Sequence, residues 1–118
     1  MIKTAALAGV FLAGLAVFSG RAEAAQVGRE CLVDSVAVIG SRMHIRCVPA
    51  ASGLGRDVTY YAMNLSEGAA KVQGLIALAI ESKRRSKAMQ LWYDQADYAS
   101  VNGCLGHNCR RLLGAAME

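Results

Sequence analysis

Four cysteines, Cys31, Cys47, Cys104 and Cys109, are the feature that most limits what this chain can fold into. An even number of cysteines in a small exported chain is typical of disulfide bonds, which add stability that a small core cannot supply. Four cysteines allow three pairings, and the local spacing favours Cys31–Cys47 together with Cys104–Cys109. A zinc site is the alternative, but the chain has no Cys-x-x-Cys pair, and the imidazole nearest to a cysteine is that of His107.

The first 24 residues predict export from the cytoplasm. Lys3 supplies a positive charge, residues 5–18 form an almost unbroken apolar run, and Ala22-Glu23-Ala24 has the small residues that signal peptidase reads. The run is about 14 residues, within the ~7–15 of a signal peptide and short of the ~20 that span a bilayer. We therefore expect a cleaved leader, a secreted or periplasmic protein and no stable membrane anchor. An uncleaved membrane anchor is the alternative.

Removal of residues 1–24 would leave a single domain over residues 25–118. This part has 11 Lys and Arg against 8 Asp and Glu, a net charge of +3, compared with +4 for the whole chain. Such a mildly basic balance suits weak attraction to anionic surfaces, and by itself it does not indicate nucleic acid. We expect no nucleic-acid partner for an exported chain of this kind.

Three strands are predicted before the middle of the domain. Residues 31–39 are rich in β-branched side chains and end at Gly40-Ser41, which is typical of a turn. Residues 42–48 alternate between apolar and polar side chains and so predict a half-buried strand that forms a hairpin with the first. Residues 49–56, with two glycines, predict a loop, and residues 57–63 a third strand.

One amphipathic helix is predicted over residues 67–82. Ser66 suits the N-cap, Glu67 suits the positive end of the helix dipole, and Leu65 is placed to pack on the first turn. Apolar side chains recur at helical spacing and should form the buried face: Val72, Leu75, Ile76, Ala79 and Ile80. Residues 88–94 and 110–117 predict the last two strands, with a polar loop between them.

The resulting order, β-β-β-α-β-β, predicts a mainly β fold with one helix. An antiparallel five-stranded barrel with the helix between strands three and four is an OB-fold. A plain α+β sandwich of the same elements is the alternative.

The second half of the chain resembles a known group of exported proteins. Residues 72–79, the segment Met89-Gln-Leu-Trp-Tyr-Asp94 and the segment Gly103-Cys-Leu-Gly-His-Asn-Cys109 resemble the B subunits of subtilase-type and pertussis-like bacterial toxins. The resemblance implies an OB-fold, a homopentamer with a separate A subunit, and binding of a cell-surface glycan without catalysis. On this resemblance, Ser35 and Tyr93 best match sugar contacts, although Tyr93 shares a predicted face with apolar residues and is also a candidate for the core.

Other residues are candidates from the strand pattern alone. Arg42, His44 and Arg46 share one face of the second strand and form a cationic stripe. This stripe is interpreted either as a site that binds a carboxylate or phosphate group of a ligand, or as an ordinary solvated surface. Trp92 faces away from its apolar neighbours, where it would stack on a ligand or lie between subunits. No catalytic motif, cofactor motif or metal motif is present. We therefore expect a non-catalytic binding module, with a monomeric periplasmic or envelope protein of structural or protein-interaction role as the alternative and a small exported enzyme as the third.

Overall fold

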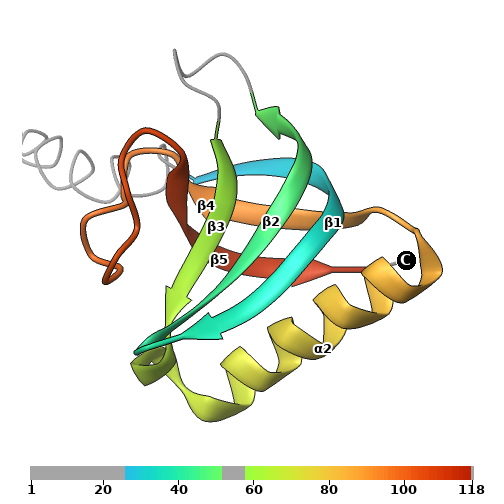
Figure 1. Ribbon diagram of the computed structural model, residues 1–118, viewed down its shortest axis with the longest axis horizontal. Coiled ribbons are helices and arrows are strands. Elements are labelled where there is room, and N and C mark those ends of the chain that lie inside the picture. The colour runs from blue at the N-terminus through green and yellow to red at the C-terminus, as the bar shows by residue number, and fades with distance from the viewer. Residues whose placement is uncertain (1–25, 52–57, 118) are drawn as a thin grey trace, which may run out of the picture.

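The computed structural model describes residues 26–51 and 58–117, so the predicted signal peptide lies outside the described residues. The predicted order of elements is confirmed, with one short 3-10 helix added before the main helix (Figure 1). The elements are β1 (Gln26–Ile39), β2 (Arg42–Ala51), β3 (Val58–Asn64), η1 (Leu65–Glu67), α2 (Ala69–Arg85), β4 (Met89–Asp94) and β5 (Cys109–Ala116).

The five strands form a closed barrel in the order β1-β2-β3-β5-β4, which confirms the OB-like barrel over the α+β sandwich. The long strand β1 makes closure feasible, because its first half pairs with β4 and its second half pairs with β2. The prediction of an antiparallel sheet is wrong at one place, since β3 and β5 run parallel. After the β4–β5 connection, β5 lies beside β3 and closes the barrel. The relative direction of β3 and β5 is not encoded in the local sequence of either strand.

Alternation along the strands decides which side chains enter the barrel. On β2, Met43, Ile45 and Cys47 are buried, and on β4 every second residue from Met89 to Tyr93 is buried. Both patterns agree with the predicted faces. The inward side chains of the strands join those of α2 in one core, so the barrel is filled and is not a pore.

Several strand boundaries differ from the prediction. β1 begins at Gln26, not at residue 31, because Gln26–Cys31 pair with β4 although they lack a β-rich composition. β2 continues to Ala51, so residues 49–51 belong to a strand that pairs back at Val58. Residues 52–56 of the predicted loop and residue 57 of the predicted third strand lie outside the described residues. β3 and β5 are each displaced by about one residue from their predicted ranges, and β4 starts one residue later.

The predicted start of the helix is wrong. Ser66 does not cap it: Ser66 lies inside η1, Gly68 occupies the N-cap position with φ of +124°, and α2 begins at Ala69. Glu67 makes an ion pair with Arg111 on β5, with 3.1 Å between Oε1 and Nη2. This contact with a neighbouring strand accounts for the acidic residue, which the sequence pattern had assigned to the helix dipole.

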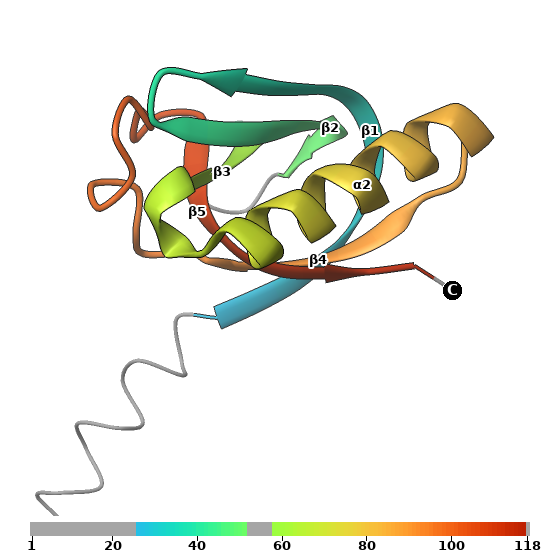
Figure 2. The same cartoon turned by 90° about the horizontal axis from the view of Figure 1, so that it is seen from below.

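The buried face of α2 agrees with the prediction at all positions but one. Val72, Leu75 and Ala79 are buried and Ile76 packs against the core, but Ile80 is 53% exposed. The buried stripe continues instead to Ser82, whose hydroxyl donates to the Lys87 carbonyl. Figure 2 shows α2 between the β1–β2 hairpin and the β4–β5 pair. The exposure of Ile80 means that the side of α2 on which it lies does not face the core.

Both predicted disulfides are present. Cys31–Cys47 joins β1 to β2 and Cys104–Cys109 closes a short loop before β5, with Cα–Cα distances of 5.2 and 5.3 Å. Since all four cysteines are bonded to one another, they are not zinc ligands. The two bonds indicate an oxidising, non-cytoplasmic environment. Across residues 26–51 and 58–117, no helix combines the length and the apolar character needed to cross a membrane.

Candidate functional site

A surface hollow of about 190 Å³ lies where β2 and β3 meet the connection between β4 and β5. We call it the β2–β3 hollow. Its lining residues come from three segments far apart in the sequence: Arg42, His44, Tyr60, Gly103, Leu105, Asn108 and Cys109. In OB-folds, the face of strands 2 and 3 with the loops at its edges is the usual place for oligosaccharide and oligonucleotide ligands.

Strand alternation presents the β2 side chains to this hollow. Because Met43 and Ile45 point into the barrel, Arg42 and His44 must point outward. Tyr60 is beside them on β3, directly opposite Arg46 in the register. Its ring meets the His44 imidazole edge to face, with 5.0 Å between centroids. Tyr60 was not among the residues predicted for the site, although its position next to the buried Tyr61 places it on the outer face of β3.

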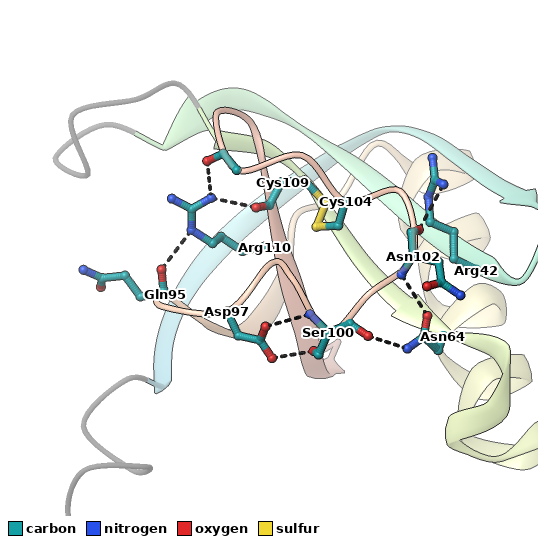
Figure 3. The surroundings of a disulfide bond; sticks show 10 residues. Arg42, Asn64, Gln95, Asp97, Ser100, Asn102, Cys104, Cys109 and Arg110 are labelled. Carbon is teal, nitrogen blue, oxygen red and sulfur yellow. Dashed lines mark hydrogen bonds between the residues drawn. A yellow bond between two sulfur atoms is a disulfide. The ribbon is translucent and has the colours of Figure 1, made fainter.

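The β4–β5 connection is held against the barrel by polar side chains (Figure 3). Asp97 accepts from the backbone N–H of Ser100 at 3.1 Å and from its hydroxyl at 2.5 Å. Asn64, at the end of β3, donates to the Ser100 carbonyl at 2.8 Å and accepts from the backbone N–H of Asn102 at 3.2 Å. These contacts fix one wall of the β2–β3 hollow.

Arg110 secures the other part of the connection, although it is only 6% exposed. Its guanidinium donates to the carbonyls of Gln95, Gly106 and Cys109 at 2.7–2.8 Å (Figure 3). The guanidinium also lies 5.6 Å from the centre of the Tyr98 ring. A buried cation needs such partners to offset its lost hydration. The Cys104–Cys109 bond closes the same loop, so the wall carrying Leu105 and Asn108 is cross-linked as well as hydrogen-bonded.

The charge in the hollow comes from Arg42. Its Nη1 donates to the Asn102 carbonyl at 3.2 Å, and its guanidinium lies over Gly103, whose φ is +80°. A Cβ on Gly103 would lie 3.0 Å from the Arg42 Cζ and closer still to Nη1, so glycine leaves room for the guanidinium. Burial, and then the positive charge of Arg42, lower the pKa of His44 below its ordinary value of 6.5. The imidazole is therefore neutral at pH 7, beside a permanent cation.

Arg46 completes the predicted stripe, but it has a different role. It forms an ion pair with Asp34 on β1 at 2.5 Å, and its Cζ lies 5.9 Å from the centre of the Tyr60 ring. The Asp34 carboxylate offsets the charge of Arg46, and Arg46 does not line the β2–β3 hollow. Of the stripe, only Arg42 and His44 face the space in which a ligand would fit.

The other candidate residues lie elsewhere. Ser35 lines a separate hollow of about 480 Å³ between β1 and α2, together with Ile80. The prediction of Tyr93 as a ligand contact is wrong: Tyr93 is 4% exposed and its ring packs on that of Tyr61, with 4.8 Å between centroids, so it belongs to the core. Trp92 is on the outer face of β4, in a third hollow. The structure thus places one of the six predicted residues in the core and distributes the other five over several surfaces.

No metal site accompanies these features in the part of the chain that the structure describes, where no three His, Cys, Asp or Glu side chains form a group able to hold an ion. A scan against protein-family models finds no match for the chain, and a search of curated proteins finds no significant match. The similarity to toxin B subunits therefore stays a hypothesis based on the residues quoted above.

Proposed function

We propose that this protein is a secreted or periplasmic binding module without catalytic activity, and that it holds an acidic group of a glycan in the β2–β3 hollow. The observation that carries the proposal is the position of the Arg42 guanidinium beside a neutral imidazole and the Tyr60 ring in the surface hollow. A planar guanidinium suits a carboxylate, and an aromatic ring suits the apolar face of a sugar.

Rigidity of the hollow supports the same function. Polar contacts from Asn64, Asp97 and Arg110 and the second disulfide hold its loop wall in place before any ligand arrives. A preformed site loses less conformational entropy on binding, which matters for a ligand that makes few contacts. The predicted leader and the oxidising environment indicated by the disulfides support a location in which a binding module would meet glycans.

The proposal extends to assembly. A shallow hollow binds weakly by itself, and several copies on one ring would gain about 10²–10⁴-fold by effective concentration. A homopentamer with a separate A subunit, as in the toxins that the sequence resembles, would provide this gain.

A structural or protein-interaction role is the second candidate. It is favoured by apolar side chains that remain exposed on β1, namely Leu32, Val38 and Ile39. Exposed apolar groups of this kind often belong to protein interfaces. A monomeric envelope protein would use this surface for a partner instead of the β2–β3 hollow for a sugar.

The test is binding of the mature, disulfide-bonded protein to an array of acidic glycans and their neutral counterparts, with solution mass measured in parallel. We expect Arg42→Ala to weaken binding to acidic glycans about tenfold or more, by loss of one charge-assisted contact. Arg85→Ala, which removes an equally charged but distant helix residue, is the matched control. Equal glycan binding by both variants, or a monomeric protein that binds no glycan, would contradict the proposal and favour the protein-interaction role.

A further inference from the structure

The outer face of β4 carries an arrangement that the β2–β3 hollow does not explain. Trp92 lies between two glycines in neighbouring strands, since its register partners are Gly28 on β1 and Gly114 on β5. The next row along the sheet is formed by Glu30, Gln90 and Ala116. A single large aromatic ring is thus surrounded by residues with small or polar side chains.

The glycines beside Trp92 are explained by space and not by backbone conformation. Neither has a positive φ, so neither position demands glycine on conformational grounds. A Cβ on Gly28 would lie 2.7 Å from Nε2 of Gln90 and 3.2 Å from Nε1 of Trp92, whereas a Cβ on Gly114 would meet nothing within 4 Å. Gly28 therefore permits the indole to lie close to the sheet, and Gly114 leaves its other side open. Glycine in a strand interior often marks such a close approach.

The polar groups around the indole have unused bonding capacity. Within the described residues, neither the indole N–H of Trp92 nor the carboxylate of Glu30 has a hydrogen-bond or ion-pair partner. Gln90 uses its amide N–H₂ on the Leu91 carbonyl at 3.2 Å, which leaves its side-chain oxygen to accept. The second N–H of Gln90 is also left to donate. The indole therefore has its own N–H donor, and one further donor and two acceptors lie beside it.

These residues line a hollow of about 510 Å³, to which Lys87 and Ala116 also contribute. This volume lies within the roughly 300–1,000 Å³ of small-molecule sites. The lining contains one acidic and one basic residue, Glu30 and Lys87, so neither sign of charge predominates in it. A ligand for this hollow needs one flat apolar face and several hydroxyl groups at its edge.

We propose that Trp92 is the platform of a second site, which binds an uncharged pyranose ring. The apolar C–H face of the sugar stacks on the indole, and its hydroxyl groups bond to the Glu30 carboxylate, the Gln90 side-chain oxygen and the indole N–H. The site differs from the β2–β3 hollow in position and in ligand charge, and it does not depend on the function proposed for that hollow. Together, the Trp92 site and the β2–β3 hollow would bind a neutral and an acidic part of one branched glycan, or two separate glycans.

The chain has a single tryptophan, so its fluorescence reports on this site directly. The mature disulfide-bonded protein is titrated with lactose, maltotriose, cellotriose, mannotriose and the trimer of N-acetylglucosamine. We expect at least one of these to shift the emission to shorter wavelength in a saturable way and to reduce quenching by iodide severalfold. The Arg42→Ala variant should titrate with the same midpoint, within about twofold, because its substitution is confined to the other hollow.

Two variants test the geometry by calorimetry with the sugar that gives the largest shift. Trp92→Ala should weaken binding roughly three- to tenfold, the equivalent of one aromatic contact. Gly28→Ala should also weaken it, because the new Cβ displaces the indole and the amide, whereas Gly74→Ala, in open space on α2, should not. Because Gly28→Ala changes no side chain of the core, a loss of binding in this variant can be attributed to the site and not to unfolding.

Three outcomes would overturn the proposal. One is that no sugar of the panel changes the emission although iodide quenches it freely. Another is binding that Trp92→Ala and Gly28→Ala leave unchanged. The third is an indole already protected from iodide without sugar, to a degree that rises with protein concentration, since a second copy of the chain would then cover this face.

Discussion

Replacing Gly103 by alanine tests how the β2–β3 hollow is built. Gly103 has a φ of +80°, and a Cβ there would overlap the guanidinium of Arg42. The substitution therefore has two separable consequences, strain in the backbone and displacement of the charged group. Gly40 has a φ of +59° and nothing within 4 Å of its Cβ position, so Gly40→Ala isolates the first consequence.

The backbone strain and the displacement of Arg42 contribute different amounts to the free energy of unfolding. An alanine in left-handed backbone costs about 1–2 kcal/mol, and this term should appear in Gly40→Ala and Gly103→Ala alike. Displacement of Arg42 also breaks its bond to the Asn102 carbonyl, which at an exposed position is worth about 0.5–1.5 kcal/mol. Gly103→Ala should therefore lower the free energy of unfolding by about 1.5–3.5 kcal/mol in the native chain.

A double-mutant cycle by urea unfolding measures the second term. In the Arg42→Ala background, Gly103→Ala should cost only the backbone term, which gives a coupling of about 0.5–1.5 kcal/mol. Gly103→Ala should also weaken binding of acidic glycans as much as Arg42→Ala does, while Gly40→Ala leaves it unchanged. A coupling below about 0.3 kcal/mol would refute the reasoning, because the two residues would then act independently.

Three further predictions concern stability. Leu75→Ala, at a 5% exposed position, should lower the free energy of unfolding by about 2–5 kcal/mol, and Ile80→Ala, at 53% exposure on the same helix, by less than half as much, as measured by urea unfolding; similar losses would mean that the helix is oriented differently. Cys31→Ala should cost about 1 kcal/mol more than Cys104→Ala, because the first bond closes a separation of 16 residues and the second one of 5; calorimetric melting of both variants decides this, and the reverse order would contradict the loop argument. Folding lowers the pKa of His44, so the stabilising contribution of the neutral imidazole is complete above the ordinary pKa of 6.5 and declines as the pH falls below it. The variant His44→Gln should therefore show a weaker dependence of the free energy of unfolding on pH between about pH 5 and 7. An unchanged slope in this variant would count against the shift.

The order of the elements and the two disulfides were predictable from local sequence. Alternation along residues 42–48 and 89–94 follows from the two-residue period of a strand, whichever strand it pairs with. The spacing of Cys31 with Cys47 and of Cys104 with Cys109 makes the near partners the simplest choice. In the helix, Val72, Leu75 and Ala79 recur at the helical period, and any packing on that face would bury them.

The candidate site was less predictable, since strand alternation tells which side of a strand a residue faces but not what lies opposite. Arg42 and His44 were found by their alternation, yet Arg46 has the same pattern and is paired with Asp34. Tyr93 resembles a ligand residue in sequence, but the inward side of β4 places it in the core. Nothing in the sequence near Tyr60 indicates that a loop more than 40 residues later completes its surroundings.

By itself, then, the sequence of this protein determined the properties that depend on neighbours along the chain: the period of each strand, the apolar side of the helix and the nearest cysteine partners. Only the tertiary structure decided the parallel β3–β5 pair, the rotation of α2 that exposes Ile80, and the meeting of Arg42 with Gly103. These depend on how the barrel closes. Closure is set by the sum of many weak contacts between distant segments, and no local window of sequence contains that sum.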